Sequence, residues 1–395
     1  MLNPGKCLFL SMTRSDFDVA IVGAGPAGST AALAMVNSGL RVALLDQSTF
    51  PRDKTCGDAV AAYAPKVLAT ISESFRQEFE NNLQRQSVNI CRVFAPSGRS
   101  LDFKFHESGN IIKRLELDNF LCNLAIRQSH VTPLFSTRVN SVLYQPEQVR
   151  WELSTSMGLI TSRLIIGCDG ANSVVTKQVS DGRLIPAHHS AAVRAYFTDV
   201  TGVNSESFEL HFISELPLGY FWIFPERDGS FNVGLGALTD FISKERINLR
   251  DLLGQVITHH KTISPRFHAA RQISEVKGFG LPLGSRKVPI SGNGWMLCGD
   301  AAHLIDPLTG EGIGQAMASG RFAGWKAVAC FRENNFTAAF MKSYDQQVYD
   351  KFWVSSRKSY FLQKYVVPRF GFFNQVFEIA HRFPVVRSWI QRAII

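Results

Sequence analysis

Three glycines and an aspartate near the start of the chain have the spacing that binds the phosphates and ribose of a dinucleotide. Gly23, Gly25 and Gly28 form a G-x-G-x-x-G run directly after an apolar stretch. In such a run the first glycine permits a tight turn, the second lets the backbone approach a pyrophosphate, and the third lets a helix pack closely on a strand. Asp46 follows a second apolar stretch, where an acid can bind ribose hydroxyls.

These residues require a strand, a helix and a second strand to position them. The sequence predicts a strand at 18–22, a helix ending near Asn37 and a strand at 41–45, which together make a βαβ unit. Pro26 suits the first turn of the helix, and the helix N-terminus offers N–H groups to phosphates. The alternative is a glycine-rich turn of any α/β protein. The complete unit favours a dinucleotide, without choosing between NAD and FAD.

Two further aspartates follow apolar strands later in the chain. Asp169 comes after LIIGC, and Asp300 comes after WMLCG, in which the glycine is Gly299. Doubly wound folds bind ligands at the carboxyl ends of strands, so both aspartates are expected at the cofactor, and Asp300 is placed to accept hydrogen bonds from a polyol chain. A helix rich in small residues is predicted at 313–329, and its N-terminus would face an anion. The residues just before this helix include Pro307, Gly310 and Gly312.

A cysteine lies in the loop predicted at 47–60, directly after the βαβ unit. Arg52 and Lys54 precede Cys56 in the run FPRDKTCGD. Two cations and a helix start at this point would lower the pKa of the Cys56 thiol if it is exposed. The other interpretation is a small buried apolar residue, as for most free cysteines.

An aromatic strand follows in the strand-rich part of the chain at 188–240. Tyr220, Trp222 and Phe224 alternate with other residues, so they share one face of a strand. They form either an aromatic core or one wall of an apolar pocket. A hairpin is predicted at 87–105 and helices at 63–85 and 243–260. No spacing typical of a metal site is found.

The composition of the chain restricts the kinds of binding partner to expect. The chain has 395 residues, 45% of them apolar, and a net charge of +9, which favours lipid surfaces or diphosphates over the nucleic acids for which no motif is present. Seven scattered cysteines indicate a reducing, cytoplasmic setting, and no apolar run is long enough to span a bilayer. The short N-terminal apolar segment is too small for a secretory signal, and translation starts at Met1 or Met12.

The tail from 351 is basic and aromatic, including Arg387, Trp389 and Arg392, so it either lies on the inner face of a membrane or packs on the body.

The order of the three glycine–aspartate motifs resembles the p-hydroxybenzoate hydroxylase-like FAD superfamily over residues 16–345. Within it, FPRDKTCG and YFWIFP resemble the geranylgeranyl reductase family. The resemblance implies that FAD is the cofactor, that Arg114 lies near it, that Cys56 lies near the flavin ring and that Tyr220 and Trp222 face the substrate. The residues it implies for the pyrophosphate, ribose, ribityl chain and flavin ring are Gly23, Gly25, Gly28, Asp46, Asp300, Pro307, Gly310 and Gly312.

Two positions depart from the family pattern. Thr176 stands where the Asp-Gly motif usually continues to an arginine, and Lys177 follows it, which puts NADPH docking there in doubt. Asp58 stands where family members often have a second glycine, which is expected to alter the loop over the flavin.

The expected fold is α/β, a Rossmann-type FAD-binding domain with an inserted antiparallel-sheet substrate domain and a C-terminal helical tail. The predicted FAD-binding domain comprises residues 16–85, 111–180 and 285–345. The substrate domain comprises 86–110 and 181–284, and the tail 346–395.

Three functions remain open from the sequence. The first is an FAD-dependent reductase of carbon–carbon double bonds in an isoprenoid or prenyl lipid, with hydride from reduced flavin and NAD(P)H or another reductant as donor. Cys56 or a water would supply the proton. The second is a monooxygenase acting on an aromatic or polyketide-like substrate. The third is a flavin-binding electron carrier or scaffold without turnover. A halogenase is disfavoured because no W-x-W-x-I-P occurs at the matching strand.

Overall fold

The first βαβ unit forms as the sequence predicts, with a shorter helix. A computed structural model describes residues 15–383 and 385. Strands β1 (Ser15–Val22) and β2 (Val42–Leu45) pair in parallel, and α1 (Pro26–Leu33) connects them. The helix ends before Asn37, because Asn37 and Gly39 adopt the left-handed conformation, with φ values of 60° and 75°, that turns the chain back toward β2.

One eight-stranded sheet contains this unit at its centre. The order of its main path is β16-β17-β9-β1-β2-β6, and β1, β2, β6, β9 and β17 run parallel. A hairpin of β7 and β8 extends it by pairing antiparallel with β9. The remaining strands of this sheet are β6 (Val131–Leu134), β7 (Val139–Gln145), β8 (Arg150–Thr155), β9 (Gly158–Gly167), β16 (Ser291–Gly292) and β17 (Trp295–Leu297).

Helix α8 (Ile313–Arg332) crosses α1 at small residues, so the two backbones lie close together. A Cβ atom at Gly320 would stand 2.1 Å from the Ala27 carbonyl oxygen, and one at Gly324 would stand 2.5 Å from that of Ala31. The crossing therefore depends on glycine at both positions and fixes α8 against the dinucleotide unit. Other helices of this half are α2 (Ala64–Ala69), α3 (Glu73–Asn82), α4 (Arg114–Ile126) and α5 (Val174–Val179). The segment at 63–85, expected as one helix, is thus two.

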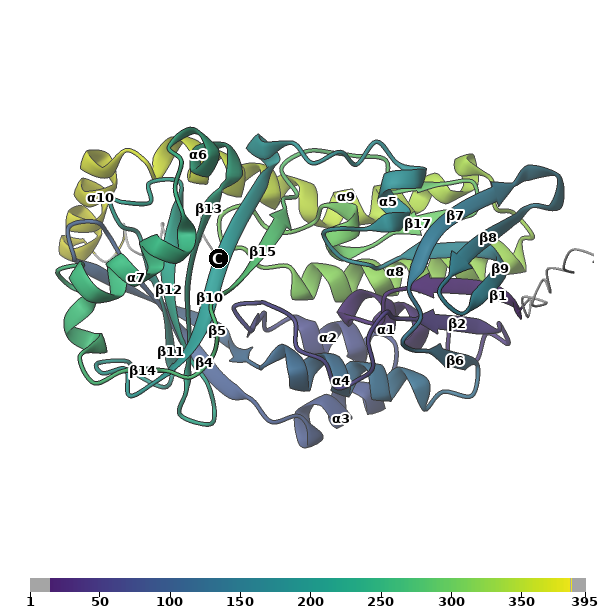
Figure 1. The fold of residues 1–395 in the computed structure, drawn as a ribbon, viewed down its shortest axis with the longest axis horizontal. Helices are drawn as coiled ribbons and strands as arrows, with labels where there is room; N and C mark the ends of the chain where they lie inside the picture. The colour runs from purple at the N-terminus through teal and green to yellow at the C-terminus, as the bar shows by residue number, and fades with distance from the viewer. Residues whose placement is uncertain (1–14, 384, 386–395) are drawn as a thin grey trace, which may run out of the picture.

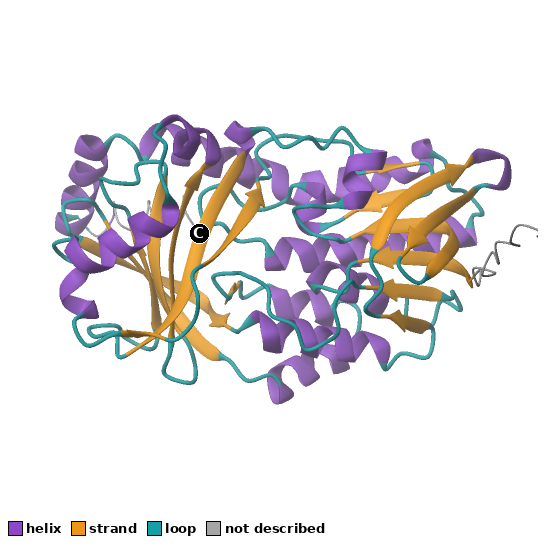
Figure 2. Ribbon diagram, viewed as in Figure 1, coloured by secondary structure: helices purple, strands orange, loops and turns teal. Residues whose placement is uncertain are grey.

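A nine-stranded sheet lies at the other end of the molecule (Figures 1 and 2). Its main path runs β14-β10-β13-β12-β11-β4-β5-β3, and β15 pairs with β10. The strand pairs are antiparallel, as expected, except that β4 and β11 run parallel. This parallel pair arises because the β4–β5 hairpin, which comes earlier in the chain, adds to the edge of the antiparallel strands that come later. Its strands are β3 (Ala59–Val60), β4 (Gln86–Phe94), β5 (Ser100–Ile111), β10 (His189–Thr198), β11 (Ser207–His211), β12 (Gly219–Pro225), β13 (Phe231–Leu238), β14 (Arg271–Gln272) and β15 (Lys277–Pro282).

The two faces of this sheet differ. Phe221 and Ile223 belong to the core that also includes residues of α7 (Leu249–His259), while Trp222 and Phe224 point to the opposite face. The alternation predicted for β12 is therefore confirmed. Helix α6 (Thr239–Lys244) follows β13.

The tail packs on the body. Helix α9 (Ala338–Phe361) continues through a π-helical turn at Leu362–Val366, and α10 (Phe370–Arg382) follows. Val367, Phe377 and Ala380 are buried in one cluster with residues of β4 and β5. This part of the tail is packed, as one of the two interpretations expected. Arg387, Trp389 and Arg392 lie outside the described residues, as do Met1 and Met12.

Candidate functional site

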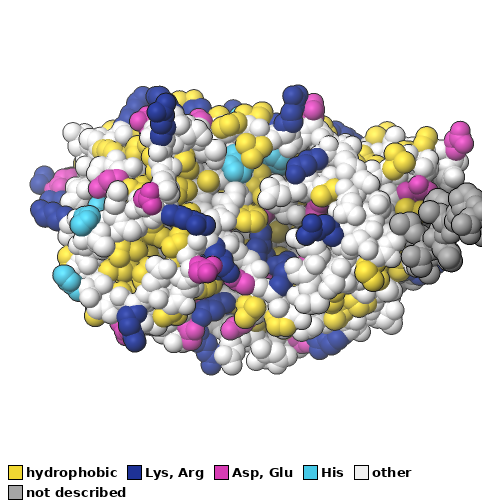
Figure 3. Space-filling view, in the orientation of Figure 1, with side chains coloured by type: hydrophobic (Ala, Val, Ile, Leu, Met, Phe, Trp, Pro, Cys, Tyr) yellow, Lys and Arg dark blue, Asp and Glu magenta, His cyan; other side chains and the backbone are white. Residues whose placement is uncertain are grey.

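One large cavity runs between the two sheets and reaches the tail. Its volume is 1470 Å³, and it is lined at one end by the glycine motif and at the other by β4, β5, β11 and α10. Figure 3 shows a hollow near the middle of one face, with basic side chains in and around it. All the residues predicted to bind cofactor or substrate line this cavity, namely Gly23, Gly25, Asp46, Cys56, Arg114, Asp169, Tyr220, Trp222, Phe224, Gly299, Asp300, Pro307, Gly310 and Gly312, apart from Gly28, which lies behind it.

The three motif glycines have different roles. Gly23 has φ of 101°, and a Cβ there would stand 2.3 Å from the Cys168 carbonyl oxygen, while one at Gly28 would stand 1.8 Å from the Gly23 carbonyl oxygen. Both are required by the fold itself. A Cβ at Gly25 would lie 3.4 Å from Arg52 Nη2, 3.9 Å from Asp118 Oδ2 and 4.0 Å from Arg114 Nη2, so this position faces a cluster of charged side chains and no backbone. Gly25 is also the N-cap of α1, with no side-chain cap, which leaves the helix N-terminus open to a phosphate.

Asp46 and two arginines surround this helix end. The Asp46 carboxylate accepts hydrogen bonds from the N–H groups of Ala24, at 3.0 Å, and Ser48, at 2.9 Å. Arg52 lies 3.7 Å from Asp46.

Arg114 is buried and bound to Asp118. Its Nε and Nη2 donate to the two Asp118 oxygens at 2.6 and 2.7 Å, and Arg52 Nη1 donates to the same carboxylate at 2.9 Å. Two guanidinium groups share the Asp118 carboxylate, and Arg52 also lies 3.7 Å from Asp46, so two arginines and two aspartates stand beside Gly25. A pyrophosphate would complete this cluster, because charge-assisted hydrogen bonds to phosphate are among the strongest that side chains form.

Asp300 lines the same cavity, in a short turn after β17. Lys54 Nζ donates to its carboxylate at 3.0 Å, which joins the 50–58 loop to this turn. A Cβ at Gly312 would lie 3.7 Å from Asp300 Oδ1, and one at Gly310, with φ of 71°, would lie 3.0 Å from the Tyr220 hydroxyl. The turn and the segment before α8 thus form one continuous surface.

Asp169 has its side chain turned toward a helix. Its carboxylate accepts hydrogen bonds from Ser173 Oγ and from the N–H groups of Val174, at 2.7 Å, and Val175, at 3.2 Å, and so caps α5. Burial raises the pKa of Asp169. The position lines the cavity, but its carboxylate oxygens are already used at the helix end.

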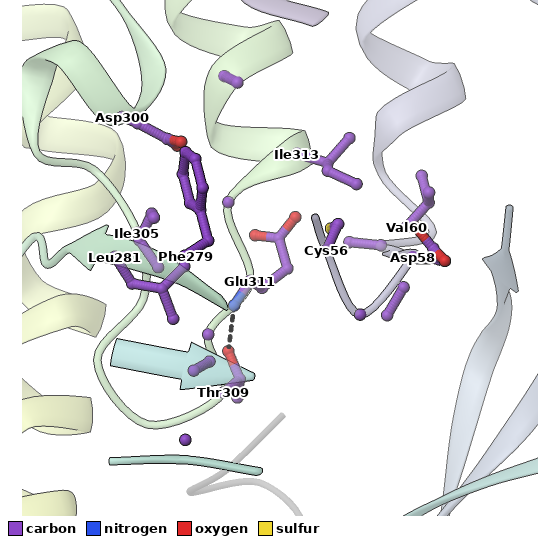
Figure 4. Close-up of a pocket in the computed structure, with 18 of the residues that line it drawn as sticks. Cys56, Asp58, Val60, Phe279, Leu281, Asp300, Ile305, Thr309, Glu311 and Ile313 are labelled. Carbon is purple, nitrogen blue, oxygen red and sulfur yellow. Dashed lines mark hydrogen bonds between the residues drawn. The ribbon is translucent and has the colours of Figure 1, made fainter. Parts of the chain in front are cut away.

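Glu311 adds a carboxyl group that the sequence did not single out. Its Oε1 accepts a hydrogen bond from the Gly314 N–H at 2.8 Å, and the Tyr63 hydroxyl donates to Oε2 at 3.3 Å. Its backbone N–H donates to Thr309 Oγ1 at 3.2 Å, the bond drawn in Figure 4. Burial raises the pKa of Glu311 to about 7, so this acid is partly neutral at physiological pH.

The aromatic wall contacts the cysteine loop through an asparagine. Trp222 Nε1 donates to Asn232 Oδ1 at 2.9 Å, and Asn232 Nδ2 donates to the Cys56 carbonyl oxygen at 2.9 Å. A Cβ at Gly57 would lie 3.2 Å from the Phe224 ring. Tyr220 donates to the Thr309 carbonyl, which ties the wall to the segment before α8. Asn232 is completely buried and was missed by the sequence analysis, because a lone asparagine in a strand carries no local signal.

Of the two interpretations of Cys56, the structure favours the buried thiol over the exposed, activated one. No helix begins at Cys56; residues 53–55 and 57–58 are irregular, and α2 starts only at Ala64. Burial raises the pKa of the thiol, against the weaker opposing effect of Arg114, so the lowering expected for an exposed thiol does not occur. The thiol is therefore protonated at neutral pH. Figure 4 shows Cys56 on one loop and Glu311 on another, facing the same space.

These residues fit an FAD. The uncapped end of α1 and the guanidinium groups of Arg52 and Arg114 beside Gly25 suit a pyrophosphate, and Asp46 beside them suits a ribose. Asp118 could have been found from the sequence, since it lies four residues after Arg114 on a predicted helix. In the described part of the chain, no helix is long and apolar enough to cross a membrane.

Comparison with known proteins agrees with this geometry. A family described as "FAD binding domain" matches residues 16–351. Digeranylgeranylglycerophospholipid reductase 2 of Methanopyrus kandleri is 27% identical over 343 residues, which cover 85% of this chain and 83% of that protein. Menaquinone reductase of Mycobacterium tuberculosis is 29% identical over 316 residues, covering 78% of this chain and 75% of that protein.

Solved structures share the fold. A geranylgeranyl bacteriochlorophyll reductase-like protein from Thermoplasma acidophilum has a TM-score of 0.75 at 21% identity, covering 96% of this chain and all of the other, 100%. A flavin-dependent brominase has a TM-score of 0.79 at 18% identity, covering 96% of this chain and 93% of that chain. The fold is therefore shared by reductases and halogenating enzymes, and the choice between them depends on the site.

Proposed function

The chain belongs to the FAD-binding domain family, and within that superfamily to the geranylgeranyl reductase family, and from this premise we propose that it saturates carbon–carbon double bonds of a prenyl-lipid substrate. It is an FAD-dependent oxidoreductase. Prenyl lipids are the substrates named for its digeranylgeranylglycerophospholipid reductase relatives, and a prenylated quinone class is consistent with the menaquinone reductase relative.

The apolar end of the cavity is the single observation that carries the proposal. The total volume of 1470 Å³ exceeds the ~300–1000 Å³ typical of one small-ligand site, so a second, extended ligand fits beside the cofactor. Apolar side chains of both the sheet and the tail line this end: Val88, Val93, Phe103, Phe105, Phe208, Leu210, Phe212, Val366, Phe373 and Phe377. Such a lining binds a hydrocarbon chain and excludes water.

The roles of the chain's own residues follow from their positions. We assign Gly23, Gly25, Asp46, Arg114, Gly299, Asp300, Pro307, Gly310 and Gly312 to the binding of FAD, with Gly28 supporting the site by the close packing of α1 and Asp169 by capping α5. When bound, FAD supplies hydride-transfer chemistry, while the protein binds, orients and keeps out water. Tyr220, Trp222 and Phe224 form the wall that orients the substrate, and the neutral Cys56 thiol holds a proton beside it.

Product mass tests the proposal. Purified holoprotein reduced with dithionite and supplied with geranylgeranylated lipids or menaquinone should yield products heavier by two hydrogens for each bond reduced. Cys56→Ser should slow product formation at least tenfold with FAD still bound, because a positioned acid contributes about 10²–10⁴-fold. Cys330→Ala, a buried change in α8, is the matched control and should leave turnover near wild type. Absence of product with every prenyl substrate contradicts the proposal.

A monooxygenase is the second candidate, favoured only by the fold shared with the brominase. It predicts NADPH-dependent oxygen uptake that an aromatic substrate stimulates. The same preparation, supplied with NADPH in air, separates the two candidates, because a reductase consumes no oxygen in proportion to substrate.

We further propose that the tail docks on an anionic lipid surface on the cytoplasmic side of a membrane. Large apolar side chains are exposed along the described part of the tail, and exposed cations accompany them at Lys358, Arg369 and Arg382. Aromatic and basic side chains together suit the lipid interface. The exposed apolar side chains are Val354, Phe361, Tyr365, Phe372, Ile379, Phe383 and Val385.

Liposome binding tests this docking surface. Serine at Phe372, Ile379 and Phe383 should abolish co-sedimentation with anionic vesicles while unfolding remains unchanged. Serine at Leu143 on β7 and at Met157 in the turn between β8 and β9, both more exposed than the three tail residues, is the control and should leave binding intact. Equal binding by both variants contradicts the assignment.

A further inference from the structure

Arg194 is a buried cation on the cavity face of the nine-stranded sheet. It lies on β10 between Val193 and Ala195, which face the core on the other side of the sheet. It lines the cavity, although only 1% of its surface is exposed, and its guanidinium carbon lies 4.3 Å from the centroid of the Tyr196 ring. Burying a guanidinium this completely costs free energy unless its N–H groups are bonded.

Only part of the Arg194 guanidinium is bonded. Nη2 donates to both oxygens of Asp53 at 3.2 Å, whereas Nε is buried without a hydrogen-bond partner among the described residues. Lys277 Nζ donates to the same carboxylate at 3.3 Å. An ionised carboxylate has about four acceptor positions, whereas an arginine and a lysine together offer about eight N–H groups. Donors of both cations therefore remain available to a further acceptor.

The Asp53 carboxylate is itself ionised. Partial burial alone would raise the pKa of Asp53, but Arg194 and Lys277 hold that pKa below its usual value. The side chains of Lys277 and Asp53 are 48% and 36% exposed, so this cluster reaches solvent. Figure 3 shows basic side chains in and around the hollow on this face of the molecule. An anion from solvent can thus reach the cations.

The strand register places the two cations at one end of a row of residues that crosses the sheet. Residues directly opposite one another on neighbouring strands share a face of the sheet. The row is cationic on β15 and β10 and apolar from β12 onward. From β15 through β10, β13, β12 and β11 to β4, its members are Lys277, Arg194, Gly234, Trp222, Leu210 and Val93.

This row leads from the cations to the apolar end of the cavity. Leu210 and Val93 line the cavity, as do Arg194 and Trp222. A Cβ at Gly234 would stand 2.4 Å from Trp222 Cζ2, so the indole ring lies over this glycine, and no side chain of the row separates the ring from Arg194. At about 4.8 Å between neighbouring strands, β10 and β4 are about 19 Å apart, a span that suits an extended hydrocarbon chain.

We propose that Arg194 and Lys277 bind a phosphate group at the head of an anionic prenyl substrate, an inference that rests on the proposed function and narrows it. The unused N–H groups of both cations form charge-assisted hydrogen bonds to the phosphate oxygens. The prenyl chain runs from this head along the row, past Trp222, to the apolar end. Anchoring the head fixes which double bonds lie at the flavin-binding part of the cavity. The phosphate belongs either to a prenyl phospholipid or to a soluble prenyl diphosphate.

Substrate binding to the oxidised holoprotein tests this site without turnover. The probes are digeranylgeranylglycerophospholipid, geranylgeranyl diphosphate and the neutral geranylgeraniol, each titrated while tryptophan fluorescence is followed. Arg194→Gln should weaken the binding of a phosphate probe at least tenfold, because charge-assisted hydrogen bonds are lost, and should leave geranylgeraniol binding within about twofold. Lys277→Gln, a change at a half-exposed side chain that the fold tolerates, should weaken phosphate binding about threefold.

Asp53→Asn distinguishes a phosphate site from a purely structural ion pair. If Arg194 only fixed the 50–58 loop to the sheet, breaking the pair from either side would weaken all probes alike. At a phosphate site, Asp53→Asn removes the competing carboxylate and should tighten the binding of phosphate probes. Arg271→Gln is the matched control, since Arg271 is an exposed cation on β14, at the same edge of the sheet, and should leave all binding unaltered.

Three results overturn the proposal. They are unaltered phosphate binding in Lys277→Gln, equal weakening of phosphate and neutral probes in Arg194→Gln and Asp53→Asn, and loss of FAD from Lys277→Gln, which would assign this cation to the cofactor. A weakening confined to the phospholipid identifies a lipid head group as the ligand. A weakening confined to the diphosphate identifies a soluble prenyl diphosphate, and either result supports the site.

The binding assay separates this inference from the proposed function. If the variants weaken phosphate probes selectively but no prenyl lipid is reduced, the proposed function fails and the phosphate site stands. If prenyl lipids are reduced and the variants bind phosphate and neutral probes as wild type does, only the inference fails.

Discussion

The two ends of the cavity are shaped by different parts of the chain. At the dinucleotide end the backbone decides the shape, since Gly23 and Gly28 leave no room for a Cβ. At the apolar end, side chains determine the shape of the cavity, because Trp222 and Phe224 alternate with the buried core residues Phe221 and Ile223. The comparison teaches that substitutions at the first end act on folding and cofactor binding, whereas substitutions at the second end act on the substrate.

Gly28→Ala should have the largest effect. Its Cβ would stand 1.8 Å from the Gly23 carbonyl oxygen, so α1 cannot keep its place on β1. We expect a loss above about 4 kcal/mol in the free energy of unfolding, seen as aggregation or a lost thermal transition. Gly254→Ala on α7, where nothing lies within 4 Å, is the control and should leave stability equal or higher. A normally folded Gly28→Ala variant would refute the claim that backbone contact shapes this end.

The pH dependence of stability in Glu311→Gln tests the segment before α8, which joins the two ends of the cavity. In the folded protein without flavin, Glu311 keeps its proton up to about pH 7, above the usual carboxyl range. The stability that this protonated group contributes is therefore fully present at acid pH and is lost as the pH rises toward 7. Relative to Glu311→Gln, wild type should therefore lose at most about 3 kcal/mol between pH 4 and pH 8. Thermal unfolding of both proteins across this range measures it. A pH-independent difference would mean that Glu311 titrates normally.

Gly25→Ala should separate folding from cofactor binding. The new Cβ would meet only side-chain ends, those of Arg52 at 3.4 Å, Asp118 at 3.9 Å and Arg114 at 4.0 Å, so the variant should fold with near wild-type stability. It should bind FAD at least tenfold more weakly, or about 1.4 kcal/mol, because the methyl group occupies the space offered to the pyrophosphate. Flavin fluorescence on titration reports the affinity. Unaltered affinity would show that the pyrophosphate lies elsewhere.

Trp222→Phe should have the smallest effect on the fold and should affect only substrate binding at the apolar end of the cavity. It removes the donor to Asn232 Oδ1, at a cost of about 1 kcal/mol, while the ring stays apolar. FAD content should be unchanged, and the Michaelis constant for prenyl substrate should rise. Loss of FAD in this variant would contradict the separation of the two ends.

The sequence predicts the dinucleotide end well because its signals are local. The glycine spacing, Asp46 after β2 and the alternation in β12 are each readable from a few consecutive residues, and the structure places them on one cavity. The functions of these residues, and the predicted domain boundaries, stay predictions. The FAD cofactor and the family are confirmed by the comparisons.

The remaining features depend on contacts between distant segments. Asn232 meets Cys56 across 176 positions, and Lys54 meets Asp300 across 246, so neither bond leaves a local pattern. The sequence left open whether Cys56 is exposed with a lowered pKa or buried, because the nearby cations were visible in the sequence and the burial was not. The parallel pairing of β4 with β11 likewise follows from tertiary assembly.

Anaerobic reoxidation of the reduced flavin tests the central claim most directly. Dithionite-reduced holoprotein, freed of excess reductant and mixed with a geranylgeranylated lipid or menaquinone, should regain the absorbance of oxidised flavin in step with saturated product. The reduced spectrum should persist in the Cys56→Ser variant over the same interval. If wild-type flavin stays reduced with every prenyl substrate and reoxidises only when oxygen enters, the account is contradicted.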